Sequence, residues 1–225
     1  EDLDSKAFLS SDIDNQIIKL EKEIHEKKNS LDKLGLQISK SRVEVAPKLV
    51  IRLTDILAQL GMPNAQFKFE INHQENYFST GKDEIQLLFS ANKGSDFGLL
   101  KKVASGGEMS RIMLAVKSVL SVDTKLPTII FDEIDTGISG EIANKMAEIM
   151  KVMSKEMQIL AITHLPQIAA KGQFHYKVFK TIKENTTISE IKLLNSNDRI
   201  LEIAEMLSGK NMSESAVNHA KALLN

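Results

Sequence analysis

Cysteine is absent from this chain of 225 residues, which excludes disulfide bonds and thiolate metal sites. A reducing cytosol fits that lack of cysteine. No apolar run approaches the roughly 20 residues that cross a bilayer, so we expect no membrane partner. Neither sign of charge prevails, because 29 Lys and Arg stand against 30 Asp and Glu. The formal net charge of −1 excludes a global basic field, so a nucleic-acid contact must be local or lie on a part of the protein absent here.

An initiating Met and a secretion signal are also missing from the start of the chain. Its first residues, Glu1-Asp2-Leu3-Asp4, are acidic and unlike a signal peptide. We therefore expect a fragment of a longer protein. The composition that remains is ordinary for a globular protein, with 42% hydrophobic and 26% charged residues. The length suits one large domain, or one domain with an extension.

The first sixty residues carry a heptad pattern of apolar side chains. The steps alternate between four and three residues, and the register slips once. The pattern comprises Ile13, Ile17, Leu20, Ile24, Leu31, Leu34, Ile38, Val45 and then Leu49, Leu53, Ile56 and Leu60. A helix of some fifty residues would span roughly 75 Å, so a partner helix explains it better than packing on its own domain. We predict a coiled-coil arm over residues 1–62, with a kink at Pro47 and an end at Gly61-Met62-Pro63-Asn64.

Residues 63–225 alternate between strand and helix patterns. Strands are predicted at 67–71, 84–89, 128–131 and 158–162, and two more in the tail at 175–180 and 187–193. Helices are predicted at 106–121 and 140–155, with two short helices at the end of the chain. This alternation predicts an α/β fold whose core holds a parallel sheet.

Two adjacent carboxylates, Asp132 and Glu133, follow the apolar strand at 128–131. Ligands of open α/β sheets lie beyond the carboxyl ends of the strands. An Asp there can hold Mg²⁺, and a Glu beside it can orient or deprotonate a water that attacks a phosphoryl group. Taken alone, the pair is more often a strand end that enters solvent.

A second candidate, Ser105-Gly106-Gly107-Glu108, opens the helix predicted at 106–121. Ser105 and Glu108 have the spacing of a capping box. Each Gly inside a helix costs about 1 kcal/mol relative to Ala, so two of them in the first turn suggest that something approaches the backbone closely. A helix N-terminus with a Ser hydroxyl is an anion site, and a phosphate is the obvious anion.

Two weaker signals complete the set. His164 follows Thr163 just after the strand at 158–162, where a lone His is more often structural. The segment Asp135-Thr136-Gly137-Ile138-Ser139-Gly140 is a polar turn before a helix, and by itself predicts only a turn and an N-cap.

The order of these elements resembles the second half of an ABC-type ATPase head of the SMC-like kind. That resemblance implies roles for each motif, with ATP and Mg²⁺ as cofactors. Asp132 would hold the Mg²⁺, Glu133 would be the catalytic base and His164 the switch histidine. The signature that meets the γ-phosphate of ATP on a partner head would be Ser105, Gly106, Gly107 and Glu108. Asp135 to Ser139 would be the D-loop region, in which Ser139 also faces the nucleotide.

The amino-acid sequences of three segments are very similar to the motifs of the RecN family of repair ATPases. These segments are residues 102–111, 131–140 and 162–167. This resemblance implies ATP-dependent repair of DNA double-strand breaks in the cytoplasm, at the nucleoid. The implied partners are double-stranded DNA ends and a second copy bound head to head. Ala104 and Ser139 depart from the Leu and Asp that many ABC proteins have at these positions.

The phosphate-binding loop Gly-x-x-x-x-Gly-Lys-Ser/Thr is absent from the sequence. The resemblance implies that it lies in the N-terminal half of the same protein, before the other arm of the coiled coil. Residues 63–225 would then be the C-terminal half of the ATPase head. We expect ATP hydrolysis by the full-length protein, and none by this fragment alone.

Two alternative functions are consistent with parts of the sequence. One is another SMC-like chromosome-maintenance ATPase, which the wording of the motifs argues against. The other is a non-catalytic coiled-coil dimerisation module, in which the motifs are only caps and turns. The order of the motifs argues against that module. A non-catalytic module would predict that Asp132→Ala or Glu133→Gln leaves the activity of the full-length protein intact.

Overall fold

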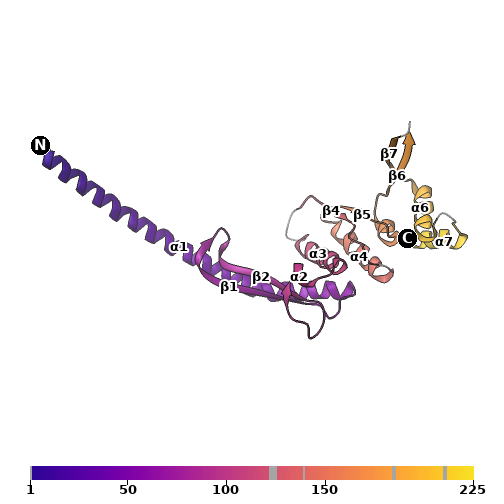
Figure 1. The fold of residues 1–225 in the computed structure, drawn as a ribbon, viewed down its shortest axis with the longest axis horizontal. Coiled ribbons are helices and arrows are strands. Elements are labelled where there is room, and N and C mark those ends of the chain that lie inside the picture. The colour runs from indigo at the N-terminus through magenta and orange to yellow at the C-terminus, as the bar shows by residue number, and fades with distance from the viewer. Residues whose placement is uncertain (1, 122–125, 139, 184–185, 210–211) are drawn as a thin grey trace. The chain divides into compact units, whose positions relative to one another are not determined.

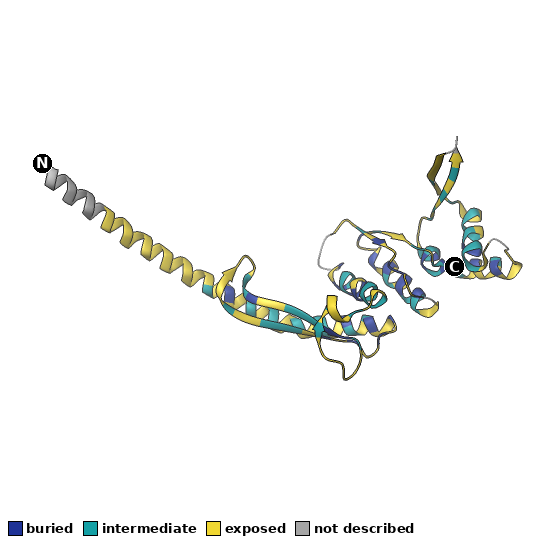
Figure 2. Ribbon diagram, viewed as in Figure 1, coloured by how far each residue is buried: buried dark blue, intermediate teal, exposed yellow. Residues whose placement is uncertain are grey.

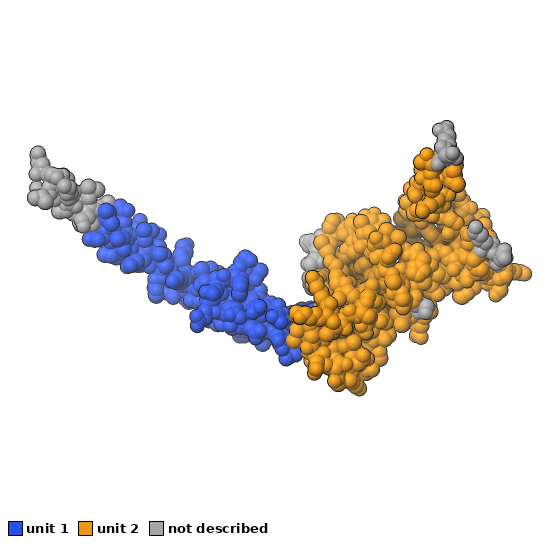
Figure 3. Space-filling view, viewed as in Figure 1, with its two compact units in different colours: residues 1–49, 68–87 blue, residues 50–67, 88–225 orange. Residues whose placement is uncertain are grey.

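A computed structural model of the chain describes residues 2–121, 126–138, 140–183, 186–209 and 212–225, without the side chains of residues 2–12 and 183. The chain divides into two compact units (Figure 3). The first holds the chain up to Leu49 together with Lys68–Leu87, and the second holds Val50–Phe67 and Leu88–Asn225. The predicted division into an arm at 1–62 and a head half at 63–225 stays a prediction.

Helix α1 (Asp2–Gln59) is a long helix, as the heptad pattern predicts, and it continues through Pro47 (Figure 1). Eight apolar heptad residues of α1 that belong to the first unit of the chain are exposed (Figure 2). Their exposed fractions lie between 40% and 56%. These residues, which we call the arm seam, are Ile13, Ile17, Leu20, Ile24, Leu31, Leu34, Ile38 and Val45. A heptad stripe that stays exposed along a helix is the surface that a second helix would cover.

The predicted end of α1 is confirmed, and its cause is a Schellman motif. The N–H of Met62 donates to the carbonyl of Leu57 at 2.9 Å, and the N–H of Gly61 donates to that of Ala58 at 3.2 Å. Gly61 has a φ of +78°, which a residue without Cβ adopts at little cost. Leu57 and Leu60 are fully buried, so the last turns of α1 belong to the core of the second unit.

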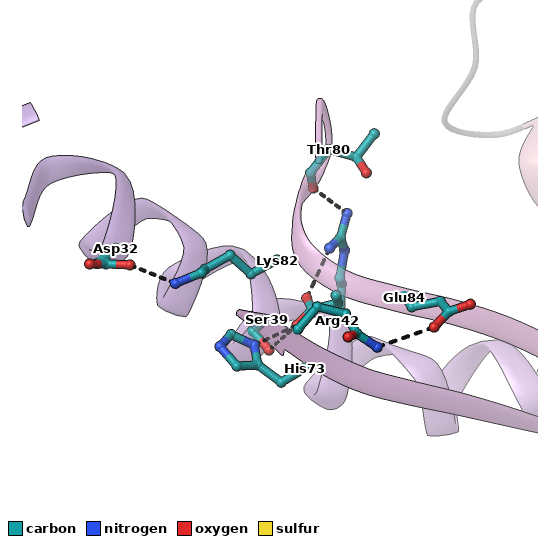
Figure 4. A network of polar contacts seen from close by, with 9 residues as sticks. Asp32, Ser39, Arg42, His73, Thr80, Lys82 and Glu84 are labelled. Carbon is teal, nitrogen blue, oxygen red and sulfur yellow. Dashed lines mark hydrogen bonds and ion pairs between the residues drawn. The ribbon is translucent and has the colours of Figure 1, made fainter. Parts of the chain in front are cut away.

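In the first unit, α1 is joined to a hairpin by a network of polar contacts (Figure 4). The hairpin consists of β1 (Gln66–Phe78) and β2 (Gly81–Ser90), both longer than predicted. The buried carboxylate of Asp83 accepts hydrogen bonds from Ser39 at 2.8 Å and from Arg42 at 2.9 Å. Lys82 forms an ion pair with Asp32 at 2.8 Å.

The second unit begins with short elements and then alternates helices with a parallel strand pair. After β3 (Gly98–Leu99), which pairs with β2, come α2 (Leu100–Val103) and α3 (Gly106–Ser121). Strand β4 (Thr128–Asp132), α4 (Gly140–Met153) and β5 (Gln158–Ile162) follow. Because β4 and β5 pair in parallel, the predicted α/β fold is confirmed.

The parallel pair is only partly covered. Parallel strands are normally buried on both faces, yet Ile130 is 64% and Ile162 is 58% exposed. Helices α3 and α4 pack together and bury apolar side chains such as Leu114 and Met146. One face of β4 and β5 is therefore an apolar surface that no described residue covers.

The tail of the second unit matches the predicted two strands and two helices. Strands β6 (Tyr176–Lys183) and β7 (Thr186–Leu193) form an antiparallel pair. Helices α6 (Ser196–Ser208) and α7 (Glu214–Leu224) pack with α5 (Pro166–Lys171) around a small core of Ala170, Ile203, Ala204, Ala216 and Ala220. None of the described helices is long and apolar enough to cross a membrane.

Candidate functional site

The ends of β4 and β5 bring two of the predicted motifs to one edge of the sheet. Asp132 lies beside Ile162 in the parallel register, so Glu133 and Thr163 are the next residues along each strand. Asp132 and Glu133 are both exposed. This edge, beyond the carboxyl ends of parallel strands, is where α/β proteins bind ligands. The structure thus places the two carboxylates where a ligand can reach them.

The chain turns sharply immediately after β4. Glu133 has a φ of +49°, the only positive φ among the described residues other than glycines. The N–H and the hydroxyl of Thr136 both donate to the carbonyl of Glu133, at 3.3 and 3.0 Å, and close the turn. A non-glycine residue in this region is strained, and such strain is concentrated at functional sites. The turn presents Glu133 at the strand end instead of continuing the sheet.

Asp135, two residues further, joins this turn to the end of β5. Its side chain is fully buried, and its Oδ2 accepts hydrogen bonds from the hydroxyl of Thr163 and from the backbone N–H of His164, the latter at 3.1 Å. The Nδ1 of His164 lies 3.3 Å from the same oxygen, while the imidazole is 69% exposed. Asp135 therefore fixes the backbone of His164, while most of the imidazole ring is exposed.

The first turn of α3 is capped as the sequence predicts. The backbone N–H of Ser105 donates to Oε2 of Glu108 at 2.7 Å, and the N–H of Glu108 donates to Oγ of Ser105 at 3.4 Å. These reciprocal bonds form a capping box. The remaining N–H groups of a first helical turn have no partner within the helix and suit an anion.

The packing of the described chain does not require the two glycines of this turn. A Cβ added at Gly106 would meet no described atom within 4 Å, and one added at Gly107 would lie 3.5 Å from the carbonyl oxygen of Thr136, an ordinary contact. Space beside Gly106 is thus open to a group from outside the chain. The same distance places the start of α3 next to the turn that follows Glu133.

Two residues of the site were not among the predicted site residues. Arg111 donates from Nε to the carbonyl of Gly107 and from Nη1 to that of Leu60, both at 3.2 Å, and so ties the first turn of α3 to the end of α1. Asp135 was predicted only as part of the polar turn and, by the resemblance, of the D-loop region, without a role of its own. No local signal indicates the bond from Arg111 to Leu60 or the bond from Thr163 to Asp135, because the partners are 51 and 28 residues apart.

The donor set at the strand end is compatible with Mg²⁺ but does not complete a site. Among the described residues, no group of three or more His, Asp and Glu side chains is arranged to hold a metal ion. Mg²⁺ is commonly bound by one or two carboxylates together with phosphates and water, so the exposed Asp132 fits as a single protein ligand. Ser139, predicted to face the nucleotide, lies outside the described residues.

Comparison with known proteins gives close sequence relatives. No protein-family model matches the chain. The DNA repair protein RecN of Deinococcus radiodurans is 43% identical over 192 residues, which are 85% of this chain and 34% of that protein. RecN of Rickettsia bellii is 40% identical over 100% of this chain and 40% of its own length. These relatives confirm the resemblance predicted from the motifs, and the chain spans about a third to two-fifths of their length.

Solved structures with a similar fold are SMC head domains. The Smc head domain with a coiled coil and joint from Pyrococcus yayanosii has a TM-score of 0.57 and 18% identity, and covers 83% of this chain and 35% of its own. The Smc head domain with an extended coiled coil from Pyrococcus furiosus has a TM-score of 0.53 and 19% identity, over 76% of this chain and 41% of its own. At this identity the likeness shows the fold alone, which is that of an SMC head.

Proposed function

Because the chain resembles RecN proteins over most of its length and has an SMC-head fold, we propose that it is the C-terminal part of a DNA-repair ATPase of the SMC-like kind. ATP hydrolysis requires its union with the N-terminal half of the same protein, which supplies the phosphate-binding loop. The observation that carries the proposal is the strand edge where Asp132 and Glu133 lie beside the residues that follow β5.

At that edge the two carboxylates have separate tasks. Asp132 would hold Mg²⁺, which when bound neutralises charge on the phosphates. Glu133 orients the attacking water and takes its proton. The strained turn at Glu133 supports this role, since strain is retained where the surrounding structure needs a fixed geometry. His164 completes the set with an exposed ring.

The first turn of α3 binds the γ-phosphate of ATP held by a second head. The free N–H groups, the hydroxyl of Ser105 and the open space beside Gly106 support this assignment, with Gly107 and Glu108 shaping the turn. Ser139 would approach the same nucleotide from the D-loop. Two copies of the protein would thus close on two ATP molecules.

The uncovered surfaces of the chain support the remaining partners. The arm seam suits an antiparallel helix from the N-terminal half, and the exposed face of β4 and β5 suits further strands of that half. Its relatives are named DNA repair proteins. From the resemblance of its motifs to the RecN family, the assembled protein would repair double-strand breaks, acting on double-stranded DNA ends in the cytoplasm. Head closure and ATP hydrolysis would change how the arms hold DNA.

Steady-state ATP turnover of the full-length protein and of the 225-residue chain tests the proposal. Each would be assayed alone, with linear double-stranded DNA, and with the same DNA as a closed circle. We expect turnover by the full-length protein, a change in its rate with linear DNA, and no turnover by the chain alone. Turnover by the purified chain, or a full-length protein without ATPase activity, would refute the proposal.

A further inference from the structure

We propose that Asp135 is a positioning residue that fixes His164 relative to Glu133 and acts on turnover only through His164. The inference rests on the proposed function, because it concerns how the same site is held in place. Asp135 itself is fully buried and would not touch the nucleotide.

The contacts of Asp135 are directed to one place. Its Oδ2 accepts from the hydroxyl of Thr163 and from the N–H of His164 at 3.1 Å, and Thr163 Oγ1 in turn accepts from the N–H of Leu165 at 3.0 Å. Three consecutive residues after β5 are thereby tied to one carboxylate oxygen. The carboxylate thus controls the backbone that carries the His164 ring.

The same carboxylate lies beside the ring of His164, whose Nδ1 is 3.3 Å from Oδ2. A hydrogen on Nδ1 favours this position of the ring, because a carboxylate attracts a donor. The other ring nitrogen, Nε2, stays available to a ligand. Since the ring is 69% exposed, little else in the described chain can set its orientation.

A buried carboxylate lowers the stability of the fold more than a neutral hydrogen-bond acceptor would at this turn. Burying a carboxylate is unfavourable unless it is paired and fully hydrogen-bonded. No Lys or Arg side chain pairs with Asp135 among the described residues, and its Oδ1 is buried without a hydrogen-bond partner there. A neutral Asn could accept the same hydrogen bonds from Thr163 and from the backbone of His164, but it lacks the negative charge that attracts a hydrogen on Nδ1 of His164. A carboxylate at this position is explained if that attraction to the ring is needed.

Asp135 also lies within the turn that begins at Glu133. The hydrogen bonds from Thr136 to the carbonyl of Glu133, and from the N–H of Ile138 to the carbonyl of Asp135 at 3.2 Å, make this turn compact. The bonds of Asp135 to the end of β5 therefore link the carboxylate base to the histidine. Groups that are positioned before the substrate arrives contribute directly to rate.

A double-mutant cycle in the full-length protein tests this coupling. Asp135→Asn and His164→Ala should each lower kcat by about tenfold or more while KM for ATP changes by less than about threefold. The double variant should be no slower than the slower single variant, because both changes remove one unit. If instead the two reductions in kcat multiply, Asp135 does not act through His164 and the inference is wrong.

Further variants keep the test decisive if Asp135→Asn folds poorly. Thr163→Val removes the hydroxyl donor and should lower kcat, whereas Thr163→Ser should restore most of it. Asp83→Asn removes another fully buried carboxylate, in the other unit, and should lower the melting temperature without lowering kcat. Equal losses of kcat in Thr163→Val and Thr163→Ser would overturn the proposal.

Wild type and Glu133→Gln in the same assay separate this inference from the proposed function. If the wild-type full-length protein does not hydrolyse ATP, the proposed function itself fails. If Glu133→Gln hydrolyses ATP normally, only the role proposed for Glu133 fails. If Glu133→Gln is inactive and the two kcat reductions multiply, only the positioning role of Asp135 fails.

Discussion

Arg42 donates a hydrogen bond to Asp83 at 2.9 Å, and the side chain of Asp83 has no exposed surface. Ser39 and His73 contact the other carboxylate oxygen at 2.8 and 3.2 Å, so Asp83 joins α1 to the hairpin within the first unit. We predict that Asp83→Asn lowers the free energy of unfolding of this unit by about 1–3 kcal/mol, because Arg42 loses its charged partner. Denaturant unfolding of the chain would measure the loss, with Glu75→Gln on β1 as an exposed control expected to show none.

The contribution of Asp83 should also depend on pH. The Arg42 guanidinium holds the pKa of Asp83 below its ordinary value of 3.8. A carboxyl whose pKa is depressed in the folded state stabilises the fold above its unfolded-state pKa, and loses that effect as the pH falls through its folded-state pKa. The difference in unfolding free energy between wild type and Asp83→Asn should therefore be constant near pH 7 and shrink below about pH 4. A difference that grows on acidification would contradict the assigned ion pair.

Gly61 should tolerate substitution less well than a second glycine with a similar φ. Both Gly61 and Gly94 have positive φ, of +78° and +82°. A Cβ at Gly61 would lie 2.6 Å from Cδ1 of Ile142, whereas one at Gly94 would meet no described atom within 4 Å. We expect Gly94→Ala to cost about 1 kcal/mol from backbone strain alone, and Gly61→Ala to cost more, since Ile142 must also move. Equal losses in thermal or denaturant unfolding would show that Ile142 accommodates the methyl group freely.

Gly106→Ala should separate stability from function. The added methyl group meets no described atom, and Ala is the better helix former, so the melting temperature should not fall. In the full-length protein the methyl group would occupy the space proposed for a phosphate, and ATP turnover should fall about tenfold or more. Ser110→Ala, one turn further along α3, is the matched control and should retain activity. Wild-type turnover in Gly106→Ala would show that no phosphate binds in the space beside Gly106.

The arm seam should matter only when its partner is present. Ile24 is 54% exposed, so Ile24→Glu should leave the melting temperature of the 225-residue chain almost unchanged. In the full-length protein the same charge would lie between two helices and should lower the melting temperature measurably. Leu57→Ala, which empties a fully buried position, should destabilise both proteins by about 2–5 kcal/mol. No effect of Ile24→Glu in the full-length protein would mean that this face of α1 has no helix against it.

Local signals account for the parts of the fold that the sequence predicts well. The capping box and the apolar periodicity place α3 at Gly106–Ser121, and a short apolar run places β5 at Gln158–Ile162, both as predicted. Strands β1 and β2 extend beyond the predicted segments, because most of their added residues are polar and lack the alternating apolar pattern of a strand, and pairing holds them in place. Pro47 was expected to kink α1, yet the helix continues through it.

The bonds that organise the candidate site could not be predicted in this way. Asp135 and Thr163 are 28 residues apart, and nothing in the polar turn at 135–140 indicates that its single carboxylate is buried. Motif order predicts which residues gather at the strand edge, but the contacts that fix their geometry depend on the tertiary structure. The chemical roles of Asp132, Glu133 and His164 remain predictions.

The most direct test of the account is ATP turnover by the full-length protein carrying Glu133→Gln, measured beside wild type with and without linear double-stranded DNA. Loss of a general base should lower turnover by about 100-fold or more while ATP binding persists, and linear DNA should change the wild-type rate. If Glu133→Gln hydrolyses ATP at the wild-type rate, the carboxylate pair at the end of β4 is structural and the proposed mechanism is wrong.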